Sequence, residues 1–263
     1  MNLAICAGNL ALDQFGLGQF CEAGKNFRRE IELAREIQDE SQEGIGHEEL
    51  GRLEAYQGRV KESSDELDAA ISSFQKQGSK EWLSIVWAHR ALRALLMKSP
   101  KEAIDSARQS QELADVDRFE RNIIRASWLL GWALIEQSHS EAEAYLSAAL
   151  TRCRRINLVE HEPDILLAWA RWHGASGNTT QAREQAEEAL TIADRCEYRL
   201  VQADVHNFLA QLALDSGDRA TALRHAEIAH ERAWCDGPPH CYKPALDEAD
   251  ALLLRCKEPV KKV

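Results

Sequence analysis

The sequence has 263 residues, of which 44% are hydrophobic and 29% are charged, and its formal net charge is −11. Because nucleic acids and anionic membranes attract basic surfaces, this acidic balance argues against both as direct partners. No stretch approaches the ~20 consecutive apolar residues of a membrane-spanning helix. The seven scattered cysteines are odd in number, which is typical of a reducing cytoplasm, and we expect the protein to be cytoplasmic.

A repeat runs through the chain. Six short breaks are separated by 40, 41, 39, 39 and 40 residues: Gly18, Gly58, Ser99, Ser138, Gly177 and Gly217. A small residue precedes each break by seven or eight positions: Ala11, Gly51, Ala91, Gly131, Ala170 and Ala210. Another follows it by four or five positions: Ala23, Ser63, Ala103, Ala142, Ala182 and Ala222. Small residues at matching points let two helices approach closely, so each unit is predicted to be an antiparallel helix pair.

The predicted helices follow the breaks in chain order. The first helices of the pairs are expected at 2–16, 42–57, 81–97, 120–137, 161–175 and 201–216. The second helices are expected at 19–38, 60–77, 101–115, 140–156, 179–196 and 218–234. Pro100 and Pro163 fall where a first helical turn tolerates proline, and Asn178 and Asp218 are placed to cap helices.

The chain is thereby divided into six units, a break and a last helix. The units are approximately 1–40, 41–79, 80–118, 119–157, 158–197 and 198–236. A proline-rich break at 237–244 precedes a helix at 245–257, which carries Leu246, Ala249 and Leu252 on one face and is predicted to cap the array. The first helix has no capping motif ahead of it. We therefore expect it to dock on something, or the chain to be the C-terminal part of a larger regulatory protein.

Several units resemble a tetratricopeptide repeat. The matching residues are Leu209, Ala210, Ala213, Gly217, Asp218, Ala222, Ala226 and Ala229; Trp169, Ala170, Gly177, Asn178, Ala182, Ala186 and Ala189; and Leu50, Gly51, Gly58, Leu67 and Ala70. The first unit departs from the family at Glu30, where alanine is usual, and the period exceeds the common one of about 34 residues. Such long units are similar to the MalT-like arrays that form C-terminal sensors of bacterial signal-transduction (STAND-type) ATPases and transcriptional regulators.

The resemblance implies an all-α fold: a right-handed α-solenoid of about six tetratricopeptide-like hairpins with a C-terminal capping helix. It also implies a role in signal transduction, with an ATPase or DNA-binding region of the same parent protein as one partner. The inner side of such a solenoid is its usual interaction surface.

Motifs for nucleotide, metal or catalysis are incomplete. The segment from Gly18 to Asn26 has one residue too many between its glycines, and no Ser or Thr follows Lys25, so it is not a P-loop. The group Cys235, His240 and Cys241, with His225 and His230 before it, lacks the tighter spacing of zinc sites and is expected to form a structural turn. We therefore expect no enzyme activity, no cofactor and no metal.

A binding groove remains as the candidate site. Counting around the first helices from the packed small residues places ten candidate residues on the concave side: Glu48, Arg52, Tyr56, Arg125, Trp128, Trp132, Arg171, Asp204, Asn207 and Gln211. The same count adds Asp164 and an apolar floor of Ala88, Leu92 and Leu95. Trp128 and Trp132 are either in the groove or packed between repeats, whereas Trp169 and Trp172 are expected to pack.

The sequence therefore predicts a non-catalytic scaffold that binds a protein or peptide in its concave groove. An aromatic pair flanked by arginine and asparagine supplies apolar contact and oriented polar groups. The alternative is a sensing module of a STAND-type ATPase or transcriptional regulator that binds a small molecule or signalling peptide.

Overall fold

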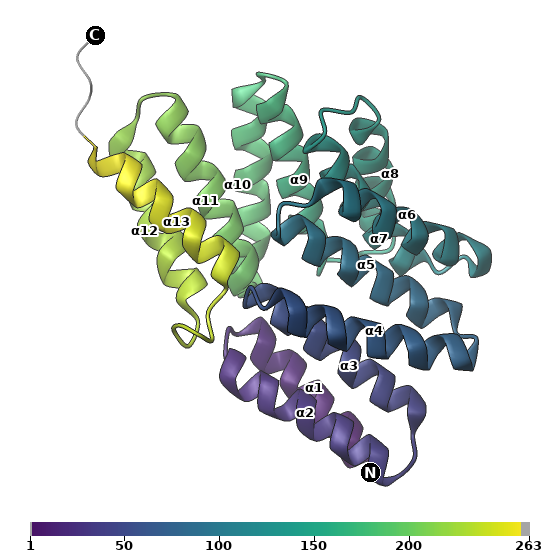
Figure 1. Cartoon of the computed structure of the whole chain (residues 1–263). Helices are drawn as coiled ribbons and strands as arrows, with labels where there is room; N and C mark the ends of the chain where they lie inside the picture. Colours follow the sequence, from purple (N-terminus) through teal and green to yellow (C-terminus); the bar gives the residue numbers. More distant parts are fainter. Residues whose placement is uncertain (1, 259–263) are drawn as a thin grey trace.

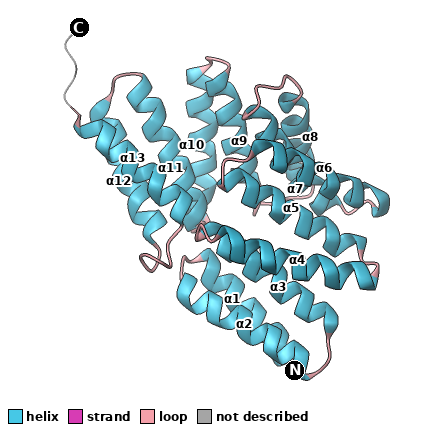
Figure 2. Cartoon of the chain, viewed as in Figure 1, coloured by secondary structure: helices cyan, strands magenta, loops and turns pink. Residues whose placement is uncertain are grey.

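The structure is an array of antiparallel helix pairs, as the repeat predicts (Figure 1). The computed structural model describes residues 2–258, so Met1, where the first predicted unit begins, lies outside the described residues. In that range Figure 2 shows only helices and loops. The thirteen helices of the described range are α1 (Leu3–Gly16), α2 (Phe20–Glu36), α3 (Glu40–Tyr56), α4 (Val60–Gln77), α5 (Lys80–Leu96), α6 (Pro100–Asp117), α7 (Glu120–Ile135), α8 (Ala142–Arg155), α9 (Glu162–Ala175), α10 (Thr179–Arg195), α11 (Arg199–Asp215), α12 (Arg219–Trp234) and α13 (Lys243–Lys257).

The predicted helices are confirmed, and no helix end lies more than two residues from its expected position. The odd-numbered helices, here called the inner helices, contact one another in series from α1 to α13, and each even-numbered helix packs against the inner helices on either side of it. This all-α solenoid is therefore held by neighbouring units. No helix of residues 2–258 has the length and apolarity needed to cross a membrane.

The turns inside the pairs explain the spacing of the breaks. Gly18, Gly58, Gly177 and Gly217 have φ values between 73° and 83°, the left-handed region that favours glycine. In the third unit the left-handed residue is Lys98, at φ 56°, and not the predicted Ser99, which precedes α6 as its N-cap residue. Because a lysine gives no turn signal in the sequence, the sequence predicts the break one residue too late.

The small residues match the size of what they face. A Cβ on Gly51 would lie 2.8 Å from Leu67 Cγ, and one on Gly131 would lie 2.6 Å from Leu146 Cδ2. The even-numbered helices are here called the outer helices. Where the outer helix of a pair has leucine at this position, the inner helix therefore has glycine. Where the outer helix has alanine at the position of Leu67 and Leu146, the inner helix also has alanine: Ala91, Ala170 and Ala210, facing Ala107, Ala186 and Ala226, all 0% exposed.

Helix ends follow most of the predicted signals. Pro100 and Pro163 lie in the first turns of α6 and α9, and Asp218 accepts a hydrogen bond from Thr221 N at 3.0 Å. Asn178 is the N-cap residue of α10 but its side chain makes no capping bond. The first helix has an N-cap residue that was not expected from the sequence, because Asn2 Oδ1 accepts from Ala4 N at 3.0 Å, while its apolar residues Leu3, Ile5 and Leu10 are exposed.

The array curves until its first and last units touch (Figure 1). Tyr242, which is 2% exposed and directly precedes α13, packs on Tyr56 with ring centroids 4.7 Å apart. Phe15 of α1 also packs on Tyr56, with ring centroids 5.2 Å apart. In the same region, Asp236 Oδ2 accepts a hydrogen bond from Cys21 N at 2.8 Å. The two ends of the chain thus enclose the inner side of the array.

The last helix therefore has two roles. On one side it continues the series of inner helices, because it packs on α11 and α12 and buries Leu246, Ala249 and Leu252 of the predicted face. On the other side Leu246 belongs to the hydrophobic cluster that includes residues of α1, α2 and α3. The helix begins at Lys243, two residues earlier than expected, since proline is tolerated in a first turn and Pro244 falls there.

Glu30 is buried between the first two units. It is 1% exposed on α2, accepts a hydrogen bond from Gln42 Nε2, and occupies space that a Cβ on Gly8 would fill. Burial raises the pKa of its carboxyl from 4.5 to about 7. The glycine opposite makes room for a glutamate where the repeat family has alanine.

We expect Asp236→Ala to lower the free energy of unfolding by about 0.5–2 kcal/mol, the usual value of a helix N-cap. No side chain of the flanking sequence caps α2, so its exposed N–H groups rely on Asp236 from the other end of the chain. Urea unfolding of the full chain measures the loss. Glu227→Ala, at an exposed position of α12, is the control, and equal stability of both variants would contradict the closure.

We expect Glu30→Gln to change how stability depends on pH. Between about pH 4.5 and 7 the folded chain keeps a proton on Glu30 that the unfolded chain has released, so stability falls as pH rises through this range. The variant lacks this loss, and its stability relative to wild type should rise by roughly 1–3 kcal/mol from pH 5 to pH 8. Urea unfolding at both pH values measures it; Glu32→Gln, exposed on the same helix, should show no such gain.

Candidate functional site

The inner helices line a partly open cavity of about 860 Å³. Every inner helix from α1 to α11 contributes to its wall, together with the loops that precede α9 and α11. The wall combines aromatic and aliphatic surface with ionisable groups: Leu12, Asp13, Phe15, Gly16, Leu17, Glu49, Arg52, Tyr56, His89, Leu92, Arg125, Trp128, Leu129, Glu160, His161, Asp164, Cys196, Glu197, Tyr198, Leu200, Val201 and Asp204. Such a composition is typical of a ligand pocket.

The wall of the cavity is acidic. It contains six carboxylates and two guanidinium groups, the carboxylates being Asp13, Glu49, Glu160, Asp164, Glu197 and Asp204. The guanidinium groups are those of Arg52 and Arg125. A ligand with a positive group is therefore favoured by the field inside the cavity.

Asp164 and Asp204 occupy equivalent places on α9 and α11. Burial is the main cause that raises the pKa of each carboxyl from 3.8 to about 7, and the Asp204 charge adds to the effect on Asp164. Asp204 accepts hydrogen bonds from the Tyr242 hydroxyl at 3.0 Å to both carboxylate oxygens. Asp164, in contrast, makes no hydrogen bond and no ion pair to any described residue. Its carboxylate is an acceptor left open to the cavity.

A second cluster of ionisable side chains lies on α3 and α5. Arg52 pairs with Glu49 at 2.6 Å, and its guanidinium lies 4.5 Å from the centroid of the Phe15 ring. Glu48 is 0% exposed and contacts His89 Nδ1, so it lies beneath the cavity wall and does not line it. Burial and then the charge of Arg52 lower the pKa of His89, which keeps its imidazole neutral. The two carboxylates thus lie against Arg52 and His89, although Glu48 Oε1 and Oε2 and Glu49 Oε2 accept no hydrogen bond from any described residue.

Arg125, Trp128 and His161 lie together on α7 and just before α9. The rings of Trp128 and His161 have centroids 5.9 Å apart, and Arg125 lies one turn before Trp128. Burial, followed by the charge of Arg125, lowers the pKa of His161. His161 Nε2 is 3.6 Å from Glu160 Oε1, which is too long for a hydrogen bond. Trp128 both lines the cavity and packs in the core, so the two expectations for it are compatible.

Two of the predicted residues lie beyond the cavity. Trp132 packs on Trp128 with centroids 6.4 Å apart and on the core, and Arg171 lies 4.3 Å from the centroid of its ring. Neither residue lines the cavity. Trp169 and Trp172 pack against the same core with centroids 5.4 Å apart, as expected. In the expected floor, only Leu92 lines the cavity; Ala88 and Leu95 are core residues.

Asn207 and Gln211 do not reach the cavity, because α13 engages their side chains. Asn207 is 1% exposed and its Nδ2 donates to Ala245 O at 2.9 Å. Gln211 Oε1 accepts from Arg255 Nη1 at 2.5 Å, and its Nε2 donates to Asp215. The structure therefore brings together Arg52, Tyr56, Arg125, Trp128 and Asp204 of the ten predicted residues, with Asp164.

Sequence reasoning missed the contributions of α1, His89 and His161. Phe15 and Asp13 line the cavity only because the first unit folds back toward the last. His161 had a readable signal, since it lies three residues before Asp164, at the N-cap position of α9.

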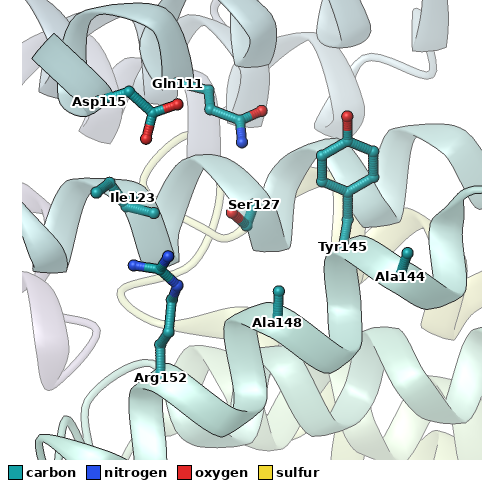
Figure 3. A pocket seen from close by; sticks show the side chains of 8 residues that line it. All are labelled: Gln111, Asp115, Ile123, Ser127, Ala144, Tyr145, Ala148 and Arg152. Atoms are coloured by element: carbon teal, nitrogen blue, oxygen red, sulfur yellow. The ribbon is translucent and has the colours of Figure 1, made fainter.

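A smaller pocket of about 320 Å³ lies between α6, α7 and α8 (Figure 3). Gln111 and Asp115 lie on one side of it, and Tyr145 and Arg152 of α8 on the other. No predicted site residue lines this pocket. Within residues 2–258, no group of three or more His, Cys, Asp or Glu side chains is arranged to hold a metal ion.

The fold is shared with several solved structures. No protein-family model matches the sequence, and no curated protein matches it either. A Rap protein complexed with competence and sporulation factor is similar, with a TM-score of 0.68, 14% identity, and alignment over 95% of this chain and 73% of that one. NprR in complex with its cognate peptide NprX has a TM-score of 0.57 and 14% identity, over 95% and 76% of the two chains.

A signal-transduction ATPase with numerous domains from Pyrococcus horikoshii, which has a tetratricopeptide-repeat sensor, is also similar. The TM-score is 0.60 with 13% identity, and the alignment covers 95% of this chain and 42% of that protein. These likenesses show that the chain has the tetratricopeptide-repeat fold.

We expect Asn207→Ala to destabilise the fold, because it removes a buried hydrogen bond between α11 and α13. The expected loss is about 1–3 kcal/mol in the free energy of unfolding, since Ala245 O is left without its donor. Urea unfolding measures it, with Gln181→Ala on the exposed surface of α10 as control. Unchanged stability together with lost peptide binding would instead assign Asn207 the ligand contact predicted from the sequence.

Proposed function

We propose that this chain, with its tetratricopeptide-repeat fold, is a non-catalytic scaffold that binds a short peptide in the cavity lined by its inner helices. The observation that carries the proposal is the cavity itself: about 860 Å³ of partly open space whose wall combines aromatic and aliphatic surface with many ionisable groups. NprR, of similar fold, is known in complex with its cognate peptide, and the Rap protein with competence and sporulation factor. Both likenesses support a peptide as occupant.

The charges of the cavity indicate the kind of peptide. Six carboxylates face two guanidinium groups, and Asp164 has no partner among the described residues. An ammonium or guanidinium group of the peptide would pair with Asp164 beside Asp204, where low local polarity strengthens such a bond. Tyr56 and Trp128 line the same cavity and supply apolar contact.

A second candidate function is a sensor within a larger signalling protein. The likeness to the tetratricopeptide-repeat sensor of the archaeal ATPase favours it, because this chain aligns with a minor part of that protein. A MalT-like regulatory role and a cytoplasmic location, the latter supported by seven free cysteines, belong to this proposal. A P-loop ATPase encoded in frame ahead of Met1 would support it, and an unrelated or untranslated sequence there would contradict it.

We expect the cavity to retain peptides with a basic residue, more strongly at pH 8 than at pH 6. The pKa of about 7 for Asp164 and Asp204 means that both carboxyls are largely neutral at pH 6 and ionised at pH 8. The full chain is incubated with two pools of random pentapeptides, one with a fixed lysine and one with a fixed glutamate, and retained peptides are measured by mass spectrometry. The lysine pool should be enriched, with several-fold more retained at pH 8.

The matched variants are Asp164→Asn and Asp115→Asn. Asp164→Asn should lower retention at pH 8 at least tenfold and weaken its pH dependence, with helicity unchanged by circular dichroism. Asp115→Asn, in the smaller pocket of Figure 3, should behave as wild type. Loss on Asp115→Asn alone would move the site to that pocket. Retention of neither pool would overturn the proposed function.

A further inference from the structure

The smaller pocket between α6, α7 and α8 exists because three residues of its wall depart from the repeat. The first is Ser127 of α7; the corresponding residues of the other units are Ala7, His47, Trp87, Leu166 and His206. The second is Ala144 of α8; the others have Lys25, Asp65, Asp105, Glu184 and Arg224. The third is Gln111 of α6, where the others have Ile31, Ile71, Leu150, Leu190 and His230. Short side chains thus replace longer ones of most units, and an amide replaces an aliphatic chain.

A contact in the second unit shows how this space is filled elsewhere. His47 Nδ1 of α3 lies 2.5 Å from Glu66 Oε2 of α4, so the two side chains bridge the inner and outer helices. Ser127 and Tyr145 hold the same two positions in the fourth unit. Because serine is much shorter than histidine, the space between α7 and α8 stays open, and the pocket has a volume of about 320 Å³.

Polar side chains of the wall are left without partners. Four make no hydrogen bond or ion pair to any residue in the range 2–258: Gln111, Asp115, Ser127 and Tyr145. Ser127 is 3% exposed and lies at the centre of the floor, between side chains of α6 and of α8 (Figure 3). Unlike Nε1 of the neighbouring Trp128, its hydroxyl is not sealed from solvent. A buried hydroxyl without a partner lowers stability, and the pocket is the space from which a ligand can supply one.

Asp115 and Arg152 bring opposite charges to the pocket. They lie toward the same end of it (Figure 3), yet no nitrogen of Arg152 is within 4.0 Å of the Asp115 carboxylate. Arg152 Nη1 instead donates to Glu120 Oε2 at 2.9 Å, and Arg155 contacts the other oxygen of Glu120. Because two guanidinium groups share one carboxylate, one positive charge remains beside the pocket. Asp115 contributes a negative charge across from it.

We propose that this pocket binds a free α-amino acid, with the α-ammonium group at Asp115 and the α-carboxylate at Arg152. A free amino acid carries these two charges on groups attached to one carbon, so it presents them side by side, as the pocket does. Both bonds are then charge-assisted, and the ligand is neutral overall. Asp115 disfavours a simple anion such as phosphate, and Arg152 disfavours a simple cation.

The remaining wall selects a polar, uncharged side chain. Ala144 and Ala148 leave room on the side of Ser127 away from the two charges, where Tyr145 also lies (Figure 3). Gln111 lies across from Ser127. A phenol hydroxyl, an amide and an aliphatic hydroxyl each donate and accept hydrogen bonds. The volume is at the lower end of the range of ligand pockets, which suits a molecule of this size.

The pocket is separate from the cavity proposed to bind a peptide. No residue lines both spaces. The amino-acid site therefore does not rest on the proposed function, and either one can fail alone. An excess of the amino acid should leave retention of the lysine pentapeptide pool unchanged. Displacement of that pool would place the amino acid in the cavity and overturn the site.

Calorimetric titration of the full chain with each free L-amino acid is the first test. Amino acids with polar, uncharged side chains should bind most tightly. The α-amide and the N-acetyl derivative of the tightest ligand each lack one of the two charges, and each should bind at least tenfold more weakly. No binding by any free amino acid overturns the proposal, and equal binding of both derivatives overturns the pairing with Asp115 and Arg152.

Charge variants locate the site. Asp115→Asn and Arg152→Gln should each lower the affinity for the tightest ligand at least tenfold. Glu112→Gln, exposed on the same helix as Asp115, and Arg154→Gln, on the same helix as Arg152, are the matched controls. Both lie outside the pocket and should bind as wild type does. Equal affinity of all four variants would overturn the assignment to this pocket.

A filled pocket gives an independent test. Ala144→Gln restores a side chain of the length found in the other units and should abolish binding, because it occupies the space of the ligand. Its helicity and unfolding temperature should match those of wild type, since Ala144 is exposed on α8. Ala251→Gln, at an exposed position of α13, is the control and should keep the affinity. Full binding by Ala144→Gln contradicts the site.

Discussion

The contact between the two ends of the array is the feature on which the site depends. A solenoid of helix pairs is stabilised mainly by neighbouring units, and by itself it presents an open concave surface. Here Tyr242 packs on Tyr56 and donates to Asp204, so that one side chain joins the last unit to the second and fixes a charged residue of the cavity. Asp236 strengthens the same closure through Cys21 N. The concave surface becomes a partly enclosed cavity.

Enclosure changes the chemistry of the residues inside. On an open surface Asp164, Asp204 and the two histidines would be solvated and would titrate near their ordinary pKa values. Inside the cavity burial raises the pKa of the carboxyls and lowers that of the imidazoles, so that neutral forms are favoured on both sides. A hydrogen-bonding or charged partner then stabilises each buried polar group. Asp164 has none among the described residues, and it is the place in the cavity where a ligand contributes most.

Stability and binding are divided between different parts of the molecule. The alanine and glycine positions between inner and outer helices, which are 0% exposed at every alanine of the series, hold each pair together. The cavity, in contrast, contains unpaired charge and unsatisfied donors, which lower the stability of the free protein. Such a local conflict within an otherwise consistent sequence is characteristic of functional sites. A ligand that pairs with the open carboxylate of Asp164 stabilises the closed form by mass action.

The sequence by itself determined the helices and the repeat. Their signals are local: small residues one or two turns from each break, prolines in first turns, and left-handed glycines such as Gly177 and Gly217. For the same reason it placed Arg52, Arg125, Trp128 and Asp204 on the inner face, because helical periodicity decides which side of a helix a residue occupies. Only the tertiary structure decided that Asn207 and Gln211 are engaged by α13, that Trp132 lies outside the cavity, and that Phe15 lines it. These depend on how far the array curves before its ends meet. That curvature is the sum of small rotations between units, and no single stretch of sequence specifies it.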